Sequence, residues 1–152
     1  MTRILFVCLG NICRSPAAEG VLRARAAARG IDVTVDSAGT GDWHVGEPPH
    51  PPMVAAARAR GIDLSRLRGR LVDAEDFRRF DLILGMDADN MARLRAIRPA
   101  DATATLGAFA DHHPDPAVTA VPDPYYTGDF EGTLDLVEAA ADGLLDALAR
   151  DA

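Results

Sequence analysis

Residues 7–16 have the sequence VCLGNICRSP, and this stretch decides the fold. It joins Ile4–Val7, a short apolar run typical of a buried parallel strand, to a helix that we expect to open at Ser15 and Pro16. Ser15 suits a helix cap, because its hydroxyl accepts a bond from an unpaired N–H group, and proline is tolerated at the first helical position. Gly30 favours the end of this helix. The predicted order is therefore strand, loop, helix.

The rest of the chain repeats this alternation. Further strands are expected at Val33–Gly39, Asp81–Met86 and Thr103–Leu106, and further helices at 52–60, 73–80 and 88–97. An amphipathic closing helix is marked by Phe130, Leu134, Val137, Leu144, Leu145 and Leu148. Strands that alternate with helices predict an α/β fold with a parallel sheet covered on both faces. We expect residues 1–152 to form a single domain, because one hydrophobic core typically serves about 100 to 200 residues.

Composition and charge exclude several classes of protein. With 48% hydrophobic and 26% charged residues, the chain has the composition of a soluble globular protein. The net charge of -7 argues against nucleic acid as a partner, because phosphate backbones are held by clustered Lys and Arg. No apolar run approaches the roughly 20 residues of a membrane span, and the N-terminus does not resemble a signal peptide. We therefore expect a cytoplasmic protein without membrane contact.

The loop between the first strand and the first helix carries the chemistry. Its length lets successive N–H groups turn inward on one anion, at the positive end of the helix dipole. Cys8 lies just past the strand, where parallel sheets bind ligands, and the same donors favour its thiolate form. Arg14 supplies a fork for two phosphate oxygens, and Ser15 is placed to donate to the Cys8 sulfur as well as to cap the helix. Gly10 allows a backbone conformation that a side chain would resist, and Asn11 tolerates left-handed geometry while its side chain bonds the loop.

Residues 8–16 as a whole resemble the signature of the low-molecular-weight protein tyrosine phosphatases. The resemblance continues at residues 36–40 (DSAGT), at 85–87 (GMD) with Asn90, and at 123–126 (DPYY), so that it covers nearly the whole chain. It implies a four-stranded parallel sheet flanked by helices on both faces, in a flavodoxin-like arrangement. It also implies a phosphocysteine intermediate on Cys8 and no metal or other cofactor.

A proton donor is needed to expel tyrosine from its phosphate ester, and two Asp-Pro pairs compete for this role. Asp115 lies in an isolated polar loop, whereas Asp123 is followed by a proline and two tyrosines, as in the family's acid motif. The resemblance thus implies Asp123 as the general acid, and later as the base toward water.

The substrate is expected to touch the loop residues that lie between Cys8 and Arg14. The predicted contacts are Leu9, Gly10, Ile12 and Cys13. Trp43, in the Gly- and Pro-rich segment 41–52, and Tyr125 are candidate walls of a slot for an aromatic ring, although Trp43 is equally compatible with covering the core. Similar enzymes that dephosphorylate arginine carry Thr at position 12 and usually lack the paired tyrosines. The resemblance therefore favours phosphotyrosine in a protein or peptide, with inorganic phosphate as product.

One position departs from the family pattern. Family members often have a His where this chain has Leu67, and that His supports the Asn and Ser of the phosphate loop. The support of Asn11 and Ser15 must then be missing or come from another polar partner, and turnover is modest if it is missing.

Other functions on the same residues stay open. An arsenate reductase would start with the same thiolate but needs further cysteines, and only Cys13 is available. A non-catalytic phosphate-binding module would need thiol, clamp and acid by coincidence. No metal site is expected, because the side chains of His112 and His113 point apart and nothing completes a shell. Cys13 also predicts redox sensitivity, since a Cys8–Cys13 disulfide would protect oxidised Cys8.

Overall fold

The computed structural model describes residues 1–151. Within them, one four-stranded parallel sheet is formed by β1 (Thr2–Cys8), β2 (Val33–Gly39), β3 (Leu82–Gly85) and β4 (Thr105–Ala108) in the order β2-β1-β3-β4. The helices are α1 (Arg14–Arg29), α2 (Pro51–Arg58), α3 (Asp76–Arg79), α4 (Ala88–Ile97), the 3-10 helix η1 (Phe109–His112), α5 (Pro124–Thr127) and α6 (Phe130–Asp151).

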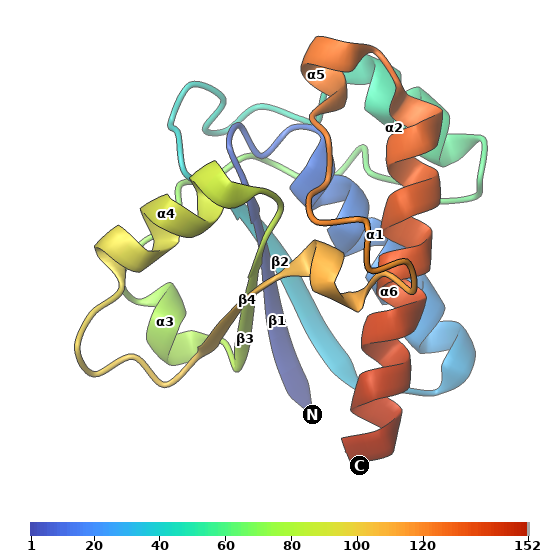
Figure 1. Ribbon diagram of the computed structural model, residues 1–152. Coiled ribbons are helices and arrows are strands. Elements are labelled where there is room, and N and C mark those ends of the chain that lie inside the picture. The colour runs from blue at the N-terminus through green and yellow to red at the C-terminus, as the bar shows by residue number, and fades with distance from the viewer. Residues whose placement is uncertain (152) are drawn as a thin grey trace.

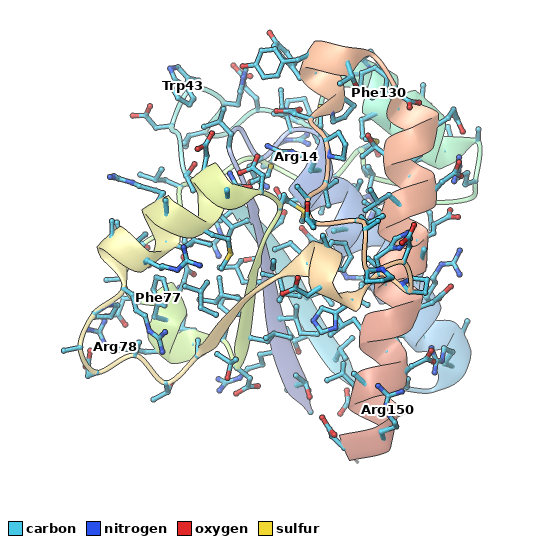
Figure 2. The ribbon with its side chains drawn as sticks, in the orientation of Figure 1. Arg14, Trp43, Phe77, Arg78, Phe130 and Arg150 are labelled. Carbon is cyan, nitrogen blue, oxygen red and sulfur yellow. The ribbon has the colours of Figure 1, made fainter. Side chains whose placement is uncertain are left out.

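The alternating side chains of β1 fill two hydrophobic layers. Ile4 and Phe6 point to the layer shared with α1, α2, η1 and α6, and Leu5 and Val7 point to the layer shared with α3 and α4. Figure 1 shows the two groups of helices on opposite sides of the sheet, and Figure 2 places Phe77 in the layer of α3 and α4. All four β1 side chains are fully buried, as expected of a parallel strand covered on both faces. The predicted fold class is confirmed.

The sheet order puts the carboxyl end of β1 at the topological switch point. β1 is flanked by β2 on one side and by β3 on the other, and α1, which connects β1 to β2, lies on the opposite face of the sheet from α4, which connects β3 to β4. Cys8 is the last residue of β1 and stands opposite Gly39 of β2. Its neighbour Val7 stands opposite Gly85 of β3. Small residues therefore flank the position from which the loop 9–13 begins.

The expected elements are present with small shifts. β4 begins two residues later than predicted, because its register follows its pairing with Leu82–Gly85 of β3. The helix expected at 73–80 is reduced to the four residues of α3. The apolar positions predicted for the closing helix are buried or partly buried in α6.

The start of α1 is a correction. The helix begins at Arg14, Cys13 stands at its N-cap position, and no side chain caps it. Ser15 is therefore inside the first turn and is not the cap, because its hydroxyl is engaged with Cys8 and Asn11 instead. Pro16 is the third helical residue, where its missing N–H group is still one that the first turn leaves unpaired.

The carboxyl edge of the sheet is enclosed by segments for which neither helix nor strand was predicted. Residues 41–50 form a loop there. The short helices η1 and α5, which were not predicted, lie after β4 and before α6. Asp123 caps α5, since its Oδ1 accepts a hydrogen bond of 3.1 Å from Tyr125 N. Among the helices in residues 1–151, none is long and apolar enough to cross a membrane.

Candidate active site

The loop after β1 is held from outside by its carbonyl groups. The carbonyls of Cys8, Leu9 and Ile12 accept hydrogen bonds of 2.8 to 2.9 Å from N–H groups of the neighbouring segment 40–50. All peptide bonds of the described chain are trans, so each carbonyl points away from the N–H group of the residue that follows it. Those N–H groups face the other side of the loop, which lines a pocket. Together with the amino end of α1 they make a site that favours an anion.

Close packing around the loop explains its glycine and asparagine. Asn11 has a left-handed φ of 58°, as predicted. Gly10 does not have a left-handed φ, so the predicted reason for this glycine is wrong. A Cβ at Gly10 would lie 3.2 Å from Cδ2 of His44, and a Cβ at Gly39 would lie 2.8 Å from the Leu9 carbonyl oxygen. At Gly39 the neighbour is backbone, so a side chain there would force a shift, whereas at Gly10 the tight contact is with the His44 ring, which would have to move only slightly.

The sulfur of Cys8 has hydrogen-bond contacts on two sides. Its Sγ lies 2.9 Å from Ser15 Oγ and accepts a hydrogen bond of 3.3 Å from Asn11 N. The Asn11 amide donates to Ser15 Oγ at 2.8 Å, so the three residues form one network. Cys8 is nearly buried, at 2% exposure, and sits at the amino end of α1, where the helix dipole stabilises negative charge.

Arg14 reaches over the loop and is held through both terminal nitrogens of its guanidinium. Its Nη1 donates to Asp87 Oδ2 at 2.6 Å and to the Val121 carbonyl at 3.0 Å. Within the part of the chain that the structure describes, its buried Nε has no hydrogen-bond partner. Burial lowers the pKa of the Arg14 guanidinium, but the negative charge of Cys8 and the bond to Asp87 outweigh it and raise that pKa above its ordinary value. Arg14 is a permanent cation beside the sulfur.

Asp123 is brought to the same place from the far end of the chain. Its Oδ2 lies 3.4 Å from Arg14 Nη2, and its side chain is 20% exposed. Its other oxygen is fixed by the N–H of Tyr125, so the carboxyl group cannot turn away freely. Asp115, the competing acid, is exposed and caps its own turn through Ala117 N. The two carboxyl groups thus have different surroundings.

A pocket of about 350 Å³ lies over the loop. It is lined by every predicted site residue except Asn11 and Ser15, which lie behind the loop. Trp43 and Tyr125 are 67% and 52% exposed, so both rings stand at the mouth of the pocket and do not cover the core. Figure 2 shows Arg14 at the end of the sheet that carries the loop, with Trp43 farther out.

Two lining residues were missed by the sequence analysis. Tyr126, 74% exposed, belongs to the DPYY motif, which was a usable signal. His44 follows Trp43 and pairs with Glu47 at 2.6 Å, and a lone His in a loop gave no signal. Among residues 1–151, no cluster of three or more His, Cys, Asp or Glu has the arrangement of a metal site.

Cys13 differs from Cys8 although both line the pocket. It is 3% exposed, and burial, followed by the negative charges of Asp123 and Cys8, raises the pKa of its thiol to about 12. It therefore stays protonated at neutral pH.

The support of the loop does not come from position 67. Leu67 is partly buried against the hydrophobic core and is not part of the polar network. The Asn11 amide is held by the hydroxyl of Ser37 at 3.0 Å and by the backbone N–H of Arg70 at 3.0 Å. Ser37 in turn donates to the buried Glu19 at 2.7 Å. The structure therefore provides polar partners for Asn11 that do not involve position 67.

The comparison with known families agrees with this geometry. A sequence model described as low molecular weight phosphotyrosine protein phosphatase matches residues 3–152. The chain belongs to this family. It is 40% identical to the low molecular weight protein-tyrosine-phosphatase YfkJ of Bacillus subtilis, over 99% of this chain and 98% of YfkJ. Low molecular weight phosphotyrosine protein phosphatases are phosphoric monoester hydrolases, so the chain is a member of an enzyme family.

Further relatives are similar over their whole length. The protein-tyrosine-phosphatase PtpA of Staphylococcus aureus is 39% identical, with 100% of this chain and 97% of PtpA covered. The crystal structure of YfkJ superimposes with a TM-score of 0.94 over 99% of this chain and 96% of that chain. The crystal structure of a Drosophila arginine phosphatase has a TM-score of 0.90 at 29% identity, over 97% and 98% of the two chains. Proteins that share this fold are therefore named for more than one substrate, tyrosine and arginine.

Proposed function

We propose that this chain hydrolyses phosphotyrosine monoesters in proteins or peptides through a phosphocysteine intermediate. In this proposal Cys8 is the nucleophile, Arg14 the phosphate clamp and Asp123 the general acid and base. Family membership supports the reaction class, because the relatives are named protein-tyrosine-phosphatases. The product is inorganic phosphate, no cofactor takes part, and we place the enzyme in the cytoplasm.

The buried Nε of Arg14 is the observation that carries the proposal. A guanidinium N–H group buried without a partner costs free energy, and it is tolerated where a ligand supplies the missing acceptor. Arg14 lines the same pocket as the Cys8 sulfur, and the N–H groups of the loop face that pocket. A tetrahedral phosphate dianion over Cys8 would accept from Arg14 and from the loop at once.

The bond changes follow from these positions. The Cys8 thiolate attacks phosphorus, the bond from phosphorus to the tyrosine oxygen breaks, and protonated Asp123 gives its proton to that oxygen. Water then attacks the phosphocysteine while the Asp123 carboxylate removes its proton, and the phosphorus–sulfur bond breaks. Ser15, 2.9 Å from the sulfur, stabilises the thiolate that leaves.

The shape of the pocket supports an aromatic substrate. Trp43 and Tyr125 stand at its mouth with exposed rings and offer faces for stacking. The phosphate of phosphotyrosine lies at the end of a long rigid side chain, which suits a nucleophilic residue, Cys8, that is only 2% exposed. Phosphoarginine is the second candidate, because an arginine phosphatase is among the structural relatives. Ile12 and the paired tyrosines at 125 and 126 favour phosphotyrosine.

Peptide hydrolysis by matched variants tests the proposal. Phosphotyrosine, phosphoserine and phosphoarginine peptides would be incubated with wild type, Cys8→Ser and Asp123→Ala, under reducing conditions and with chelator. We expect turnover of phosphotyrosine that Cys8→Ser abolishes and Asp123→Ala lowers by roughly 10² or more. Asp115→Ala is the matched control, because Asp115 precedes a proline as Asp123 does but is exposed outside the pocket.

Different failures separate the parts of the proposal. Full activity in Cys8→Ser, or loss of activity in chelator, would exclude the thiolate mechanism. Equal losses in Asp115→Ala and Asp123→Ala would remove the assignment of the acid. Faster turnover of phosphoarginine than of phosphotyrosine would keep the mechanism and change the substrate.

A further inference from the structure

A second cavity, of about 430 Å³, adjoins the pocket over the loop and lies on the side of α4. The two cavities share four lining residues, Leu9, Arg14, Asp123 and Tyr126. Beyond this shared wall the second cavity is lined by residues of α4 and its cap, namely Asp87, Asp89, Asn90 and Arg93. Figure 1 shows α4 beside the end of the sheet that carries the loop. A ligand in the pocket over the loop therefore has room to continue toward α4.

Two polar side chains of the second cavity are already used by the fold. Asp87 has both oxygens engaged, one by Asn90 N at 2.8 Å and the other by Arg14 at 2.6 Å. The side chain of Asn90 is turned inward, since the residue is 1% exposed and its Oδ1 accepts a hydrogen bond of 3.1 Å from Met86 N. Neither group can bind a further ligand without losing a contact that holds α4 in place.

Asp89 and Arg93 are the exposed charges of the second cavity. Asp89 lies in the first turn of α4, where a carboxylate stabilises the helix through its dipole and its unpaired N–H groups. Arg93 lies in the middle of the same helix, where the dipole offers a cation no such gain. Within residues 1–151 Arg93 forms no ion pair, not even with Asp89 one turn earlier. Its charge is therefore not explained by the fold.

Arg93 is also distinct from the other cationic groups that line the two cavities. Arg14 is paired with two carboxylates, and the ring of His44 is bound to Glu47 at 2.6 Å. Among the described residues, the guanidinium of Arg93 is the cation of these cavities that remains free for a ligand. Its planar fork matches a carboxylate. Beside a pocket for phosphotyrosine, a carboxylate is supplied by an acidic residue of the same peptide.

We propose that the second cavity is a subsite for the acidic side chain of a residue that flanks phosphotyrosine, and that Arg93 is the specificity-determining residue of this subsite. The proposal rests on the proposed function, because the phosphotyrosine must occupy the pocket over the loop. The peptide then passes over Tyr126, whose ring is exposed and shared by both cavities. Two residues of extended chain span about 7 Å, so the acidic residue lies within two positions of the phosphotyrosine.

A series of phosphotyrosine peptides tests the subsite. The peptides carry Glu, Gln or Lys at one of the two positions before or the two positions after phosphotyrosine and are otherwise identical. For wild type we expect kcat/KM at one of these positions to be about three- to fivefold higher with Glu than with Gln, the gain of a solvent-exposed ion pair. The difference should lie in KM, because the flanking contact is equal in the ground state and the transition state. It should shrink at about 0.5 M salt.

Variants of Arg93 separate recognition from a structural effect. Arg93→Gln should bring the ratio of the Glu to the Gln peptide close to one, and Arg93→Lys should restore part of the preference. Arg93→Glu should invert it, so that the Lys peptide becomes the better substrate. A merely structural role would lower the turnover of all peptides alike and leave their ratio unchanged.

Arg95→Gln is the matched control. Arg95 is an exposed arginine of the same helix that lines neither cavity and forms no ion pair within residues 1–151. Residues two positions apart on a helix do not face the same side, so this variant removes an equal charge from another face of α4. We expect it to keep the turnover and the Glu preference of wild type.

Three results would overturn the proposal. The first is a wild type that shows no Glu preference at any of the tested positions. The second is a preference that persists in Arg93→Gln, or that Arg95→Gln removes equally. The third is a Lys preference that Asp89→Asn abolishes, because the cavity would then select a basic side chain. Failure of the proposed function is distinct: wild type would then hydrolyse none of the phosphotyrosine peptides, whereas in these three results it hydrolyses them.

Discussion

Asp87 Oδ2 lies 2.6 Å from Nη1 of Arg14, and the two residues are 73 positions apart in the chain. Asp87 is also the N-cap of α4, where its Oδ1 accepts from Asn90 N at 2.8 Å. The carboxylate is thereby fixed in orientation by a helix end while its second oxygen holds one edge of the guanidinium. Among the described residues the buried Nε of Arg14 has no partner, whereas its Nη2 lies 3.4 Å from Asp123 Oδ2.

Asp87→Asn is predicted to weaken phosphate binding without removing the clamp. The amide keeps the cap of α4 but loses the charge that orients Arg14, so we expect kcat/KM for phosphotyrosine to fall about tenfold and the inhibition constant of inorganic phosphate to rise. Arg14→Lys should cost about 10²-fold or more, because an ammonium cannot make the bidentate contact. Steady-state kinetics with phosphate as inhibitor measures both.

Asp81→Asn serves as the control for this pair. Asp81 also accepts from an arginine, Arg3, but at the other end of the sheet and in an exposed position. Unchanged kinetics are expected there. An Asp87→Asn enzyme with the phosphate inhibition of wild type would show that Arg14 is oriented without Asp87.

The two cysteines are predicted to react differently with alkylating agents. Burial raises the pKa of the Cys13 thiol to about 12, so at pH 7 to 8 this residue should stay unmodified while Cys8 reacts. Peptide mapping after a short treatment with iodoacetamide would measure the two sites separately. Phosphate in the pocket should slow the reaction of Cys8. Modification of Cys13 at a rate equal to that of Cys8 would contradict the prediction.

A protective disulfide is the redox prediction. Both cysteines line one pocket, so oxidised Cys8 has a thiol partner nearby. After peroxide treatment and reduction with dithiothreitol, wild type should recover most of its activity and Cys13→Ser markedly less. Equal recovery of the two proteins would mean that Cys13 has no such role. Non-reducing peptide mapping of the oxidised wild type provides the direct check for a Cys8–Cys13 bond.

The sequence was sufficient for what depends on local pattern. β1 and the loop 9–13 could be predicted because an apolar run indicates a buried strand and because Asn11 takes a left-handed conformation that asparagine tolerates. The start of α1 could not, because Ser15 is a good cap in isolation and only the fold brings its hydroxyl to Cys8. α5 was missed for a related reason: its four residues are too few to leave a helical period, and its cap at Asp123 becomes visible only in the structure.

The residues of the candidate site also fall into two groups, those that the sequence could predict and those that only the structure reveals. Cys8 and Arg14 lie within one motif, so their proximity was predictable, and Asp123 was chosen through a family resemblance. Glu19 gives no signal of its own, since a lone acid in a helix is usually a solvated residue, and Asp87 was visible only as part of the resemblance at residues 85–87, with no role assigned. Their roles are found only when burial and hydrogen bonds are known, as with Glu19 at 4% exposure.

Asp76→Asn is predicted to destabilise the fold more than the loss of an exposed ion pair does. Asp76 is fully buried and binds the Arg70 guanidinium with both oxygens, at 2.9 and 3.1 Å. The variant leaves the Arg70 charge with only the half-exposed Asp36, 3.1 Å away, so we expect the free energy of unfolding to drop by about 3 kcal/mol. Arg70 N also holds Asn11, so activity should fall as well. Urea unfolding with Asp101→Asn as an exposed control measures the difference, and equal effects of the two changes would refute it.

The stability of the protein is predicted to decrease as pH falls below about 6.5, in part through His112. Burial lowers the pKa of this imidazole, and nearby Asp111 only partly opposes the effect. The unfolded chain therefore binds the proton more readily than the folded one, so the stabilising contribution is complete above the unfolded pKa of 6.5 and is lost as pH drops through the lower, folded value.

His112→Asn removes that titration and isolates it from the carboxylates, which wild type and variant share. The free energy of unfolding would be measured by urea at pH 7.5 and 5.5 in both proteins. At pH 7.5 the free energy of unfolding of the variant should be lower than that of wild type, because a half-buried ring at the end of η1 is lost. Between pH 7.5 and pH 5.5, however, it should decline less. The two proteins are compared by how much the free energy of unfolding changes between pH 7.5 and pH 5.5. A loss of packing that is equal at both pH values does not alter this difference. An equal decline in the two proteins would show that the imidazole takes up its proton as easily in the folded state as in the unfolded one.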